Sequence, residues 1–193
     1  MILHEKVQPY NIILASNSPR RKQFLTDLGL RFSVKPVNIN EKYPYLLKDK
    51  DIALYIAHEK AKAFNDLNKN DLLITCDTIV WIDDIALGKP ENKEQAIAML
   101  TKLSGKTHQV ISAVCLKSTF KEDLFFDVTD VTFNNLNSKD INYYIDTYQP
   151  FDKAGSYGIQ EWIGLIGIEK ISGSYTNVVG MPMEKLYQHL KNF

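Results

Sequence analysis

The stretch Ile12-Ile13-Leu14-Ala15-Ser16-Asn17-Ser18-Pro19-Arg20-Arg21 decides how the first part of the chain folds. Residues 11–15 form a short apolar run, which predicts a β-strand. Ser18 is suited to cap a helix and Pro19 to occupy its first position, so a helix is expected to begin there. Gly29 is suited to end that helix. The stretch therefore predicts a strand–loop–helix unit with two arginines in the first helical turn.

The position of Arg20 and Arg21 favours an anion site. The amino end of a helix carries partial positive charge, so a cation there is unfavourable by about 0.3–1 kcal/mol. Free backbone N–H groups, the hydroxyls of Ser16 and Ser18 and two guanidinium groups would together suit a phosphate. The alternative interpretation is that both arginines point to solvent and pair with carboxylates.

The composition describes an ordinary globular protein. Its 193 residues are 45% hydrophobic and 24% charged, which suits one domain or two tightly joined lobes. The formal net charge is zero, which argues against nucleic acid or an anionic membrane as a partner. No signal-peptide pattern or membrane-spanning apolar run occurs. Cys76 and Cys115 are expected to be reduced core residues, and the four histidines lack metal-ligand spacing. A cytoplasmic location is expected.

Strand and helix patterns alternate along the rest of the chain. Strands are predicted over 31–40, 72–82, 85–87, 109–116, 124–133, 162–171 and 174–179. Helices are predicted over 51–67, from a cap at Asn92 to Leu103, from a cap at Ser138 to Pro150, and from Pro182. This mixture favours a single α/β domain over residues 1–193, with one long mixed β-sheet flanked by helices, two lobes and a cleft.

Two charged residues fall at positions that are predicted to be buried. Lys60 lies inside the apolar arc of helix 51–67, whereas Lys62 lies outside it, so Lys60 must reach water or meet an anion. Asp77 is the only charged residue in the β-prone run 72–82, where an unpaired carboxylate is costly. A cluster of N–H groups, a basic partner or a divalent metal could compensate it, and a metal fits an exposed kink of the strand best.

Two more lysines lie in predicted loops. Lys89 follows Gly88 and precedes Pro90, and Lys153 lies in a loop with two glycines, which suits ligand binding but also a plain connector. In a neutral protein, several cations around Asp77 indicate a phosphate site with a bound cation. By contrast, Gly105-Lys106-Thr107 is not a phosphate-binding P-loop, because the required first glycine is absent and a strand follows.

Seven motifs in register resemble the Maf family of nucleoside triphosphate pyrophosphatases over essentially the whole chain. They are Ser16-Asn17-Ser18-Pro19-Arg20-Arg21, Lys60-Ala61, Asp77-Thr78, Leu87-Gly88-Lys89-Pro90, Leu103-Ser104-Gly105-Lys106-Thr107-His108, Asp152-Lys153-Ala154-Gly155 with Tyr157-Gly158-Ile159-Gln160, and Asn177-Val178-Val179-Gly180-Met181-Pro182. The resemblance implies an elongated α/β fold of the inosine triphosphatase-like (Maf/Ham1) type, with a cleft between lobes and often a homodimer.

The resemblance also implies an activity and its residues. A nucleoside triphosphate would be hydrolysed to the monophosphate and pyrophosphate, with a divalent cation, Mg²⁺ or Mn²⁺, as cofactor. The family's acidic catalytic position falls on Asp77, as proton acceptor or metal ligand, and a second acidic position, also catalytic and metal-binding, falls on Glu41. The family's substrate-binding positions fall on Ser16, Arg20, Arg21, Lys60, Lys89 and Lys153.

Three positions imply the substrate. Asp77-Thr78 together with Gln160 resembles the dTTP and UTP pyrophosphatases, whereas the 7-methyl-GTP type has other residues there. Thr78 and Gln160 could recognise a pyrimidine edge, and Arg20 matches a third position linked to selectivity. Removal of non-canonical nucleotides would be a related role. The alternatives are a 7-methyl-GTP pyrophosphatase and a non-catalytic nucleotide-binding regulator of cell division.

Overall fold

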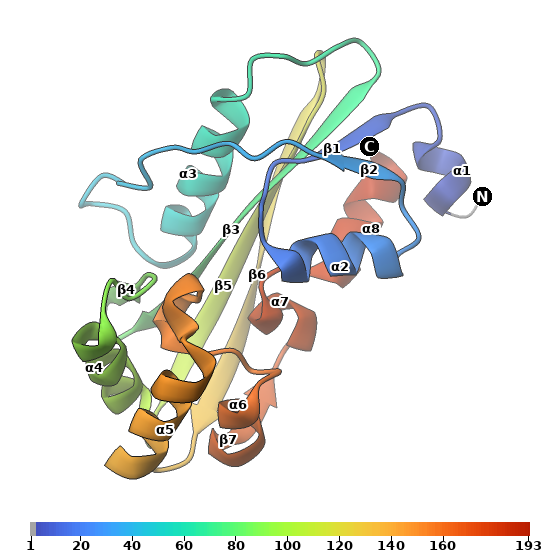
Figure 1. The fold of residues 1–193 in the computed structure, drawn as a ribbon. Helices are drawn as coiled ribbons and strands as arrows, with labels where there is room; N and C mark the ends of the chain where they lie inside the picture. The colour runs from blue at the N-terminus through green and yellow to red at the C-terminus, as the bar shows by residue number, and fades with distance from the viewer. Residues whose placement is uncertain (1–2) are drawn as a thin grey trace. The chain divides into compact units, whose positions relative to one another are not determined.

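The structure is a computed structural model, which describes residues 3–193. These residues form a mixed seven-stranded sheet in the order β2-β1-β3-β5-β6-β7, with β4 paired to β3 (Figure 1). The strands are β1 (Asn11–Leu14), β2 (Phe32–Val34), β3 (Asp71–Ile82), β4 (Ile85–Leu87), β5 (Thr107–Lys117), β6 (Glu122–Phe133) and β7 (Ile168–Ser172). Strand β1 is parallel to β2 and β3, whereas β4 and β7 are antiparallel to their neighbours. The predicted α/β class with a mixed sheet is confirmed.

Helices precede, follow and separate these strands. They are α1 (Leu3–Val7), α2 (Pro19–Asp27), α3 (Asp49–Lys62), α4 (Lys93–Leu103), α5 (Ser138–Tyr148), α6 (Trp162–Gly167), α7 (Tyr175–Val179) and α8 (Met183–Asn192), with short 3₁₀ helices η1 (Pro150–Asp152) and η2 (Ala154–Ser156). In the part of the chain that the structure describes, every helix is too short or too polar to cross a membrane.

The chain forms two compact units. The first comprises Met1–Asp77, Ser112–Asp127 and Gly180–Phe193, and the second comprises Thr78–Ile111 and Val128–Val179. Strands β3, β5 and β6 each contribute residues to both units. The interpretation of residues 1–193 as a single domain and the expected cleft between lobes stay predictions.

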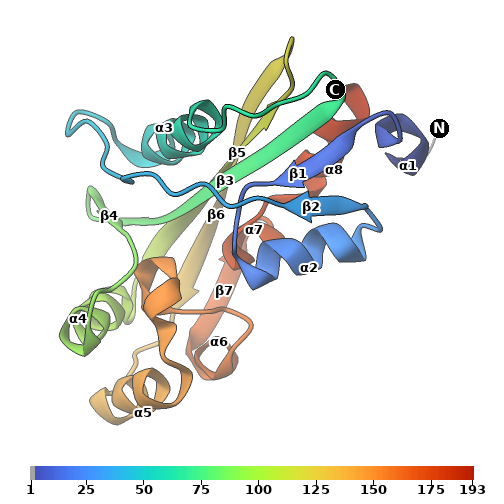
Figure 2. The ribbon, with the colours of Figure 1, turned by 45° about the horizontal axis from the view of Figure 1, so that its top comes forward.

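The first unit is organised by the opening stretch. Strand β1 pairs with β3 from Asn11 opposite Asp71 to Leu14 opposite Ile74, and both strands are largely buried. Ser18 caps α2, because its hydroxyl accepts a hydrogen bond from the backbone N–H of Arg21. Helix α2 lies alongside β1 and β2, and α1 packs beside α8 (Figure 2). The predicted strand–loop–helix unit is therefore confirmed.

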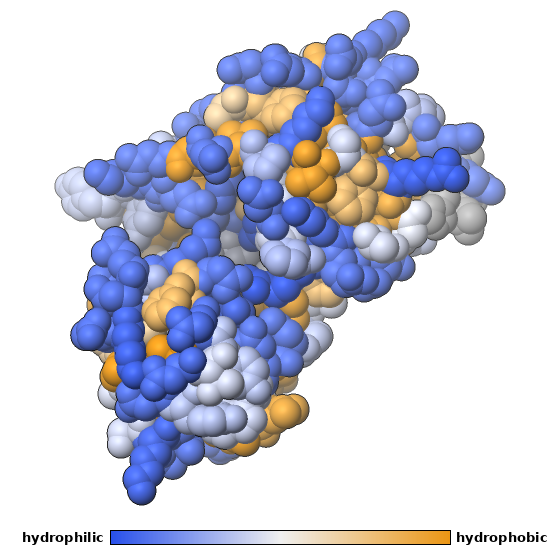
Figure 3. Space-filling view, viewed as in Figure 1, coloured by the Kyte–Doolittle hydropathy of each residue, from blue (hydrophilic) through white to orange (hydrophobic). Residues whose placement is uncertain are grey.

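The core of the second unit lies around α4 and α5, which pack against each other. Asn92 caps α4 by accepting a hydrogen bond from the Gln95 N–H at 2.9 Å. Fully buried side chains include Leu100 of α4 and Tyr144 of α5. On the face shown in Figure 3, the surface of the second unit is mostly hydrophilic, with some hydrophobic surface near α6, where Leu165 and Ile166 are exposed. Apolar side chains of this unit are thus mainly buried between its own elements.

Several predictions about secondary structure are wrong. The strand predicted over 31–40 is confined to Phe32–Val34, and the helix predicted over 51–67 ends at Lys62. Residues 162–171 begin as helix α6 and become a strand only at Ile168, and residues 175–179 form helix α7 instead of a strand. A tight local turn accounts for the difference at 162–171, and tertiary contacts account for that at 175–179. A Cβ atom on Gly164 would lie 1.8 Å from the Ile159 carbonyl oxygen, and Asn177 of α7 is buried, donating to Val110 and Thr129. The cap of α5 is Asn137, one residue before the predicted Ser138.

His108 makes the stability of the second unit depend on pH. Its Nε2 lies 2.7 Å from the Tyr157 hydroxyl, its ring packs edge-on against Phe133, and its side chain is buried. Burial lowers the pKa of His108 from 6.5 to about 4. The unfolded chain therefore binds an extra proton between these values, so stability is complete above pH 6.5 and falls as the pH is lowered toward 4.

We expect the shifted pKa of His108 to lower the free energy of unfolding by about 3 kcal/mol near pH 4, relative to neutral pH. Urea unfolding of the wild type and of His108→Gln between pH 7 and pH 4.5 measures it. The wild type should lose more free energy of unfolding than the variant, which carries no titratable group at this position. Equal losses in the two proteins would contradict a neutral, buried His108.

Candidate active site

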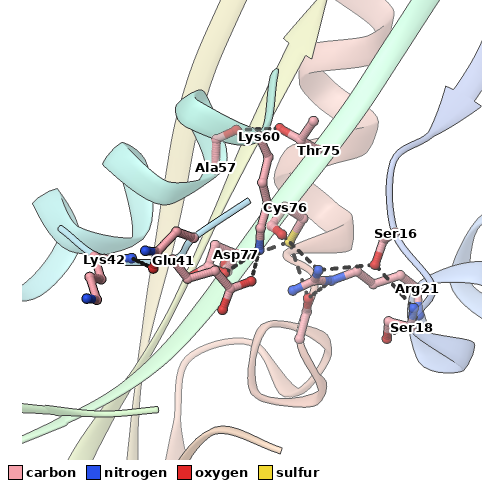
Figure 4. A network of polar contacts seen from close by, with 12 residues as sticks. Ser16, Ser18, Arg21, Glu41, Lys42, Ala57, Lys60, Thr75, Cys76 and Asp77 are labelled. Carbon is pink, nitrogen blue, oxygen red and sulfur yellow. Dashed lines mark hydrogen bonds and ion pairs between the residues drawn. The ribbon is translucent and has the colours of Figure 1, made fainter. Parts of the chain in front are cut away.

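Lys60 and two carboxylates form the centre of the candidate site in the first unit. Lys60 Nζ lies 2.7 Å from Asp77 Oδ1 and 2.7 Å from Glu41 Oε1 (Figure 4). Lys60 and Asp77 are 8% and 7% exposed, whereas Glu41 lies in an exposed segment before α3. Lys60 therefore meets anions instead of reaching water, and a basic partner compensates Asp77. The expectation that Asp77 lies at an exposed kink of the strand is wrong, because Asp77 is buried within β3 and paired with Lys60.

Local structure explains why these residues meet. Helix α3 buries one side, which includes Ile52, Ile56 and Lys60 at the spacing of successive helical turns. Strand β3 is buried along most of its length, and Asp77 follows the last β1-paired residue, Ile74, by three positions. The Thr75 hydroxyl donates to the Ala57 carbonyl at 2.6 Å and so fastens α3 to β3 one helical turn before Lys60.

Arg21 extends this charged group toward the loop after β1. Its Nε donates to the Gly180 carbonyl at 3.0 Å, and its Nη1 donates to the Cys76 carbonyl at 2.8 Å and to Ser16 Oγ at 3.4 Å. Backbone carbonyls thus hold the guanidinium beside the residue that precedes Asp77 (Figure 4). Arg21 therefore does not simply point to solvent, as the alternative interpretation would have it, but is held by protein oxygens. Arg20 is half-buried in the same helical turn.

Burial and charge both shift the proton affinities of this group. Burial raises the pKa of Asp77 above its ordinary value, although the positive charge of Lys60 acts to lower it. Burial acts to lower the pKa of Lys60, but Asp77 and Glu41 together raise it above its ordinary value. Lys60 therefore remains a cation at neutral pH, and the raised pKa of Asp77 makes it better suited to accept a proton than an exposed aspartate would be.

Asp77 and Glu41 also fit a metal that arrives with a substrate. No group of three or more His, Cys, Asp and Glu side chains within residues 3–193 is placed to hold a metal ion. The two carboxylates nevertheless converge on one ammonium group, so both face the same small region. Mg²⁺ commonly binds one or two carboxylates and completes its shell with water and substrate phosphates. Asp77 and Glu41 therefore suit a metal ion that is also bound by the substrate phosphates better than a metal ion that the protein holds by itself.

The second unit contains the other residues that the sequence predicted for the site, which are Thr78, Lys89, Lys153 and Gln160. Lys153 is 8% exposed, and its Nζ lies 2.7 Å from Asp152 Oδ1 and 3.1 Å from Glu161 Oε1. The Gly155 N–H donates to the Gly88 carbonyl at 3.0 Å, which ties the Lys153 loop to the exposed Lys89 loop. Gln160 is exposed directly before Glu161, and Thr78 is half-buried on β3 directly after Asp77.

Two residues near Lys153 were not predicted from the sequence. Tyr144 donates a hydrogen bond to Glu161 Oε2 and accepts one from the Gly158 N–H at 2.9 Å. Tyr144 has the pattern of an ordinary core residue of α5, and Glu161 that of a surface charge. No local signal distinguishes either one, because their partners come from other elements of the same unit.

The family follows from a comparison of the whole sequence. The profile of the family described as Maf-like protein matches residues 11–193. The chain belongs to the Maf family. A relative from Phocaeicola vulgatus, named dTTP/UTP pyrophosphatase, is 55% identical over 189 residues, covering 97% of this chain and 98% of the relative. A relative of the same name from Flavobacterium psychrophilum is 53% identical over 192 residues, covering 99% and 98%.

Comparison of structures supports the same fold. A HAM1 protein from Coxiella burnetii matches with a TM-score of 0.53 over 95% of this chain and all of that chain, at 14% sequence identity. The predicted Maf/Ham1 type of fold is therefore confirmed. In this Maf chain, Ser16, Arg21, Glu41, Lys60 and Asp77 form one connected group. The roles assigned to them, and to the residues of the second unit, stay predictions.

Proposed function

We propose that this Maf protein hydrolyses nucleoside triphosphates, with dTTP and UTP as its preferred substrates, to the monophosphate and pyrophosphate. The observation that carries this proposal is the buried Lys60–Asp77 pair with Glu41, next to a guanidinium that backbone carbonyls hold in place. Buried charges that are arranged in this way are costly, and they cluster at functional sites. The substrate follows the name of the relatives that are more than 50% identical.

Cations of the site bind the phosphates in this proposal. Arg21 already uses three donor contacts on protein oxygens, so its orientation is set before substrate arrives. The Arg21 guanidinium, the Ser16 hydroxyl and the N–H groups at the start of α2 are donors of the kind that binds phosphate oxygens. Lys60 offers an ammonium beside Asp77, and Arg20, Lys89 and Lys153 contribute further positive charge.

Asp77 acts as the proton acceptor. A water held by its carboxylate loses a proton to it while attacking the α-phosphorus, and pyrophosphate leaves with the electrons of the broken P–O bond. Lys60 stabilises the negative charge that develops on the phosphate oxygens, since a fixed cation in a buried site needs no rearrangement during the reaction. Asp77 and Glu41 would also hold Mg²⁺ or Mn²⁺, which supplies Lewis-acid stabilisation of those oxygens when bound.

Base selection is assigned to Thr78, Gln160 and Arg20. A hydroxyl and a carboxamide each both donate and accept, so Thr78 and Gln160 can pair with the alternating groups on a pyrimidine edge. Gln160 is exposed and Thr78 half-buried, so solvent reaches both. A homodimer remains a prediction, which sedimentation equilibrium of the purified protein would test.

A panel of triphosphates tests the proposed function. The purified protein is incubated with dTTP, UTP, CTP, GTP and 7-methyl-GTP, with Mg²⁺, with Mn²⁺ or with a chelator, and the products are separated by ion exchange. We expect monophosphate and pyrophosphate in equal amounts, kcat/KM at least about tenfold higher for dTTP and UTP than for 7-methyl-GTP, and no turnover with chelator.

Three results would contradict this proposal in different ways. Faster turnover of 7-methyl-GTP would place the protein in the other subgroup. Release of inorganic phosphate in place of pyrophosphate would show cleavage of a different anhydride bond. Tight nucleotide binding without turnover, under every metal condition, would favour a non-catalytic nucleotide-binding regulator.

A further inference from the structure

A chain of hydrogen bonds in the second unit connects Lys153 to the loop that contains Gln160. Lys153 Nζ lies 3.1 Å from Glu161 Oε1, and the other carboxylate oxygen of Glu161 accepts from the Tyr144 hydroxyl. The Tyr144 oxygen in turn accepts from the Gly158 N–H at 2.9 Å. One tyrosine and one glutamate therefore connect a phosphate-binding candidate with the backbone two residues before a base-reading candidate.

Both connecting residues are fixed by the elements they belong to. Tyr144 is fully buried on the apolar side of α5, where its ring packs within the core of this unit. Glu161 immediately precedes α6, and its side chain is only 20% exposed. The two connecting residues are thus held by α5 and by the start of α6, which keeps the groups they bind in a narrow range of positions.

The glycine at position 158 leaves room for the side chains of this arrangement. A Cβ atom there would lie 2.8 Å from Glu161 Cδ and 2.9 Å from Gln160 Nε2. Both distances are shorter than carbon and nitrogen atoms tolerate, so a side chain at position 158 would displace the ends of the Glu161 and Gln160 side chains. The ends of the Glu161 and Gln160 side chains therefore both lie beside the Gly158 backbone.

The two carboxylates that bind Lys153 are not equivalent. Asp152 lies 2.7 Å from Lys153 Nζ, but its side chain is 55% exposed and adjacent in sequence. Glu161 is more sheltered and uses its two oxygens for two different partners, Lys153 and Tyr144. A sheltered, charge-assisted contact holds its geometry better than an exposed one. Glu161 is thus the residue that sets where the Lys153 ammonium lies.

We infer that Tyr144 and Glu161 are positioning residues that couple phosphate binding by Lys153 to base recognition by Gln160. This inference rests on the proposed function, because it assigns those two roles to Lys153 and Gln160. Neither positioning residue needs to touch the substrate. Loss of the Tyr144 hydroxyl frees Glu161 and leaves the Gly158 N–H without its acceptor, so both binding groups move together.

The test uses Tyr144→Phe with Tyr143→Phe as its matched control. Tyr143 is on the same helix, is 51% exposed and packs edge-on against Trp162. Calorimetry measures binding of the non-hydrolysable α,β-methylene analogues of dUTP and GTP, and steady-state kinetics measure KM and kcat for UTP and GTP. For Tyr144→Phe we expect about tenfold weaker binding of the dUTP analogue, a smaller preference over GTP and a nearly unchanged kcat.

A second pair of variants distinguishes positioning from folding. Glu161→Gln keeps an oxygen acceptor for Lys153 and should lose less affinity than Glu161→Ala, while thermal denaturation reports stability for both. Unchanged affinity and base preference in Tyr144→Phe would overturn the inference. The inference would also be overturned if Tyr144→Phe bound the dUTP and GTP analogues more weakly by the same factor and lost stability in proportion. If the wild type binds neither analogue and turns over no triphosphate, the proposed function itself fails.

Discussion

Replacing Asp77 with Asn is expected to lower kcat for dTTP and UTP by about a thousandfold, which is the usual size of a lost general base. The amide has nearly the shape of the carboxylate and can still accept from Lys60, which lies 2.7 Å away, so the local packing is retained. The amide cannot accept a proton from water at neutral pH. Initial rates at saturating substrate, measured by pyrophosphate release, test this prediction.

The dependence on Mg²⁺ separates the two roles proposed for Asp77. If Asp77 accepts the proton, the loss in kcat persists at saturating Mg²⁺. If it acts mainly as a metal ligand, raising the Mg²⁺ concentration restores part of the rate, because the weakened site is refilled by mass action. Wild-type turnover by Asp77→Asn at ordinary Mg²⁺ would remove Asp77 from the mechanism altogether.

Asp71→Asn is the matched control for this experiment, because Asp71 is the first residue of the same strand and is also buried. Its carboxylate accepts from the Asn68 N–H at 2.9 Å, from the Asn68 amide at 3.0 Å and from the Asn11 amide at 3.2 Å. The substitution should therefore cost stability, about 1–3 kcal/mol for the lost acceptor, but leave kcat close to the wild-type value.

Replacing Lys60 with Met should affect both stability and turnover. Methionine fills the space of the lysine stem but leaves the buried Asp77 carboxylate without its cation, which typically costs about 3–5 kcal/mol. Turnover should fall by about a hundredfold or more, because a preorganised positive group is lost from the site. Urea unfolding and pyrophosphate release on the same preparation measure the two effects.

Lys62→Met provides the control, two residues further along α3. Lys62 Nζ lies 2.8 Å from Glu59 Oε1 on the exposed side of the helix. Both stability and turnover should match the wild type within error, since exposed ion pairs on helices contribute little. Equal effects of the two lysine substitutions would mean that the contacts of Lys60 with Asp77 and Glu41 have no special importance.

Local patterns in the sequence predicted much of the fold. The cap at Ser18 with Pro19, the apolar run 72–82 and the helical periodicity around Lys60 all depend on neighbouring residues, and the structure confirms each of them. The burial of Lys60 and Asp77 could be predicted for the same reason. The sequence-based strands over 162–171 and 174–179 failed. At 162–171 a tight local turn brings Gly164 against the Ile159 carbonyl, and at 174–179 contacts of Asn177 with the distant Val110 and Thr129 outweighed local propensity.

The sequence by itself determined the α/β class, the start of α2 and the burial of one lysine and one aspartate, because capping and periodicity act over a few residues. Only the tertiary structure decided which groups these charges meet. Glu41 reaches Lys60 from an irregular segment, carbonyls of Cys76 and Gly180 hold Arg21, and Glu161 joins Lys153 to Tyr144. Such contacts join residues that are separated in the sequence. These residues come within hydrogen-bonding distance only when the folded elements pack together.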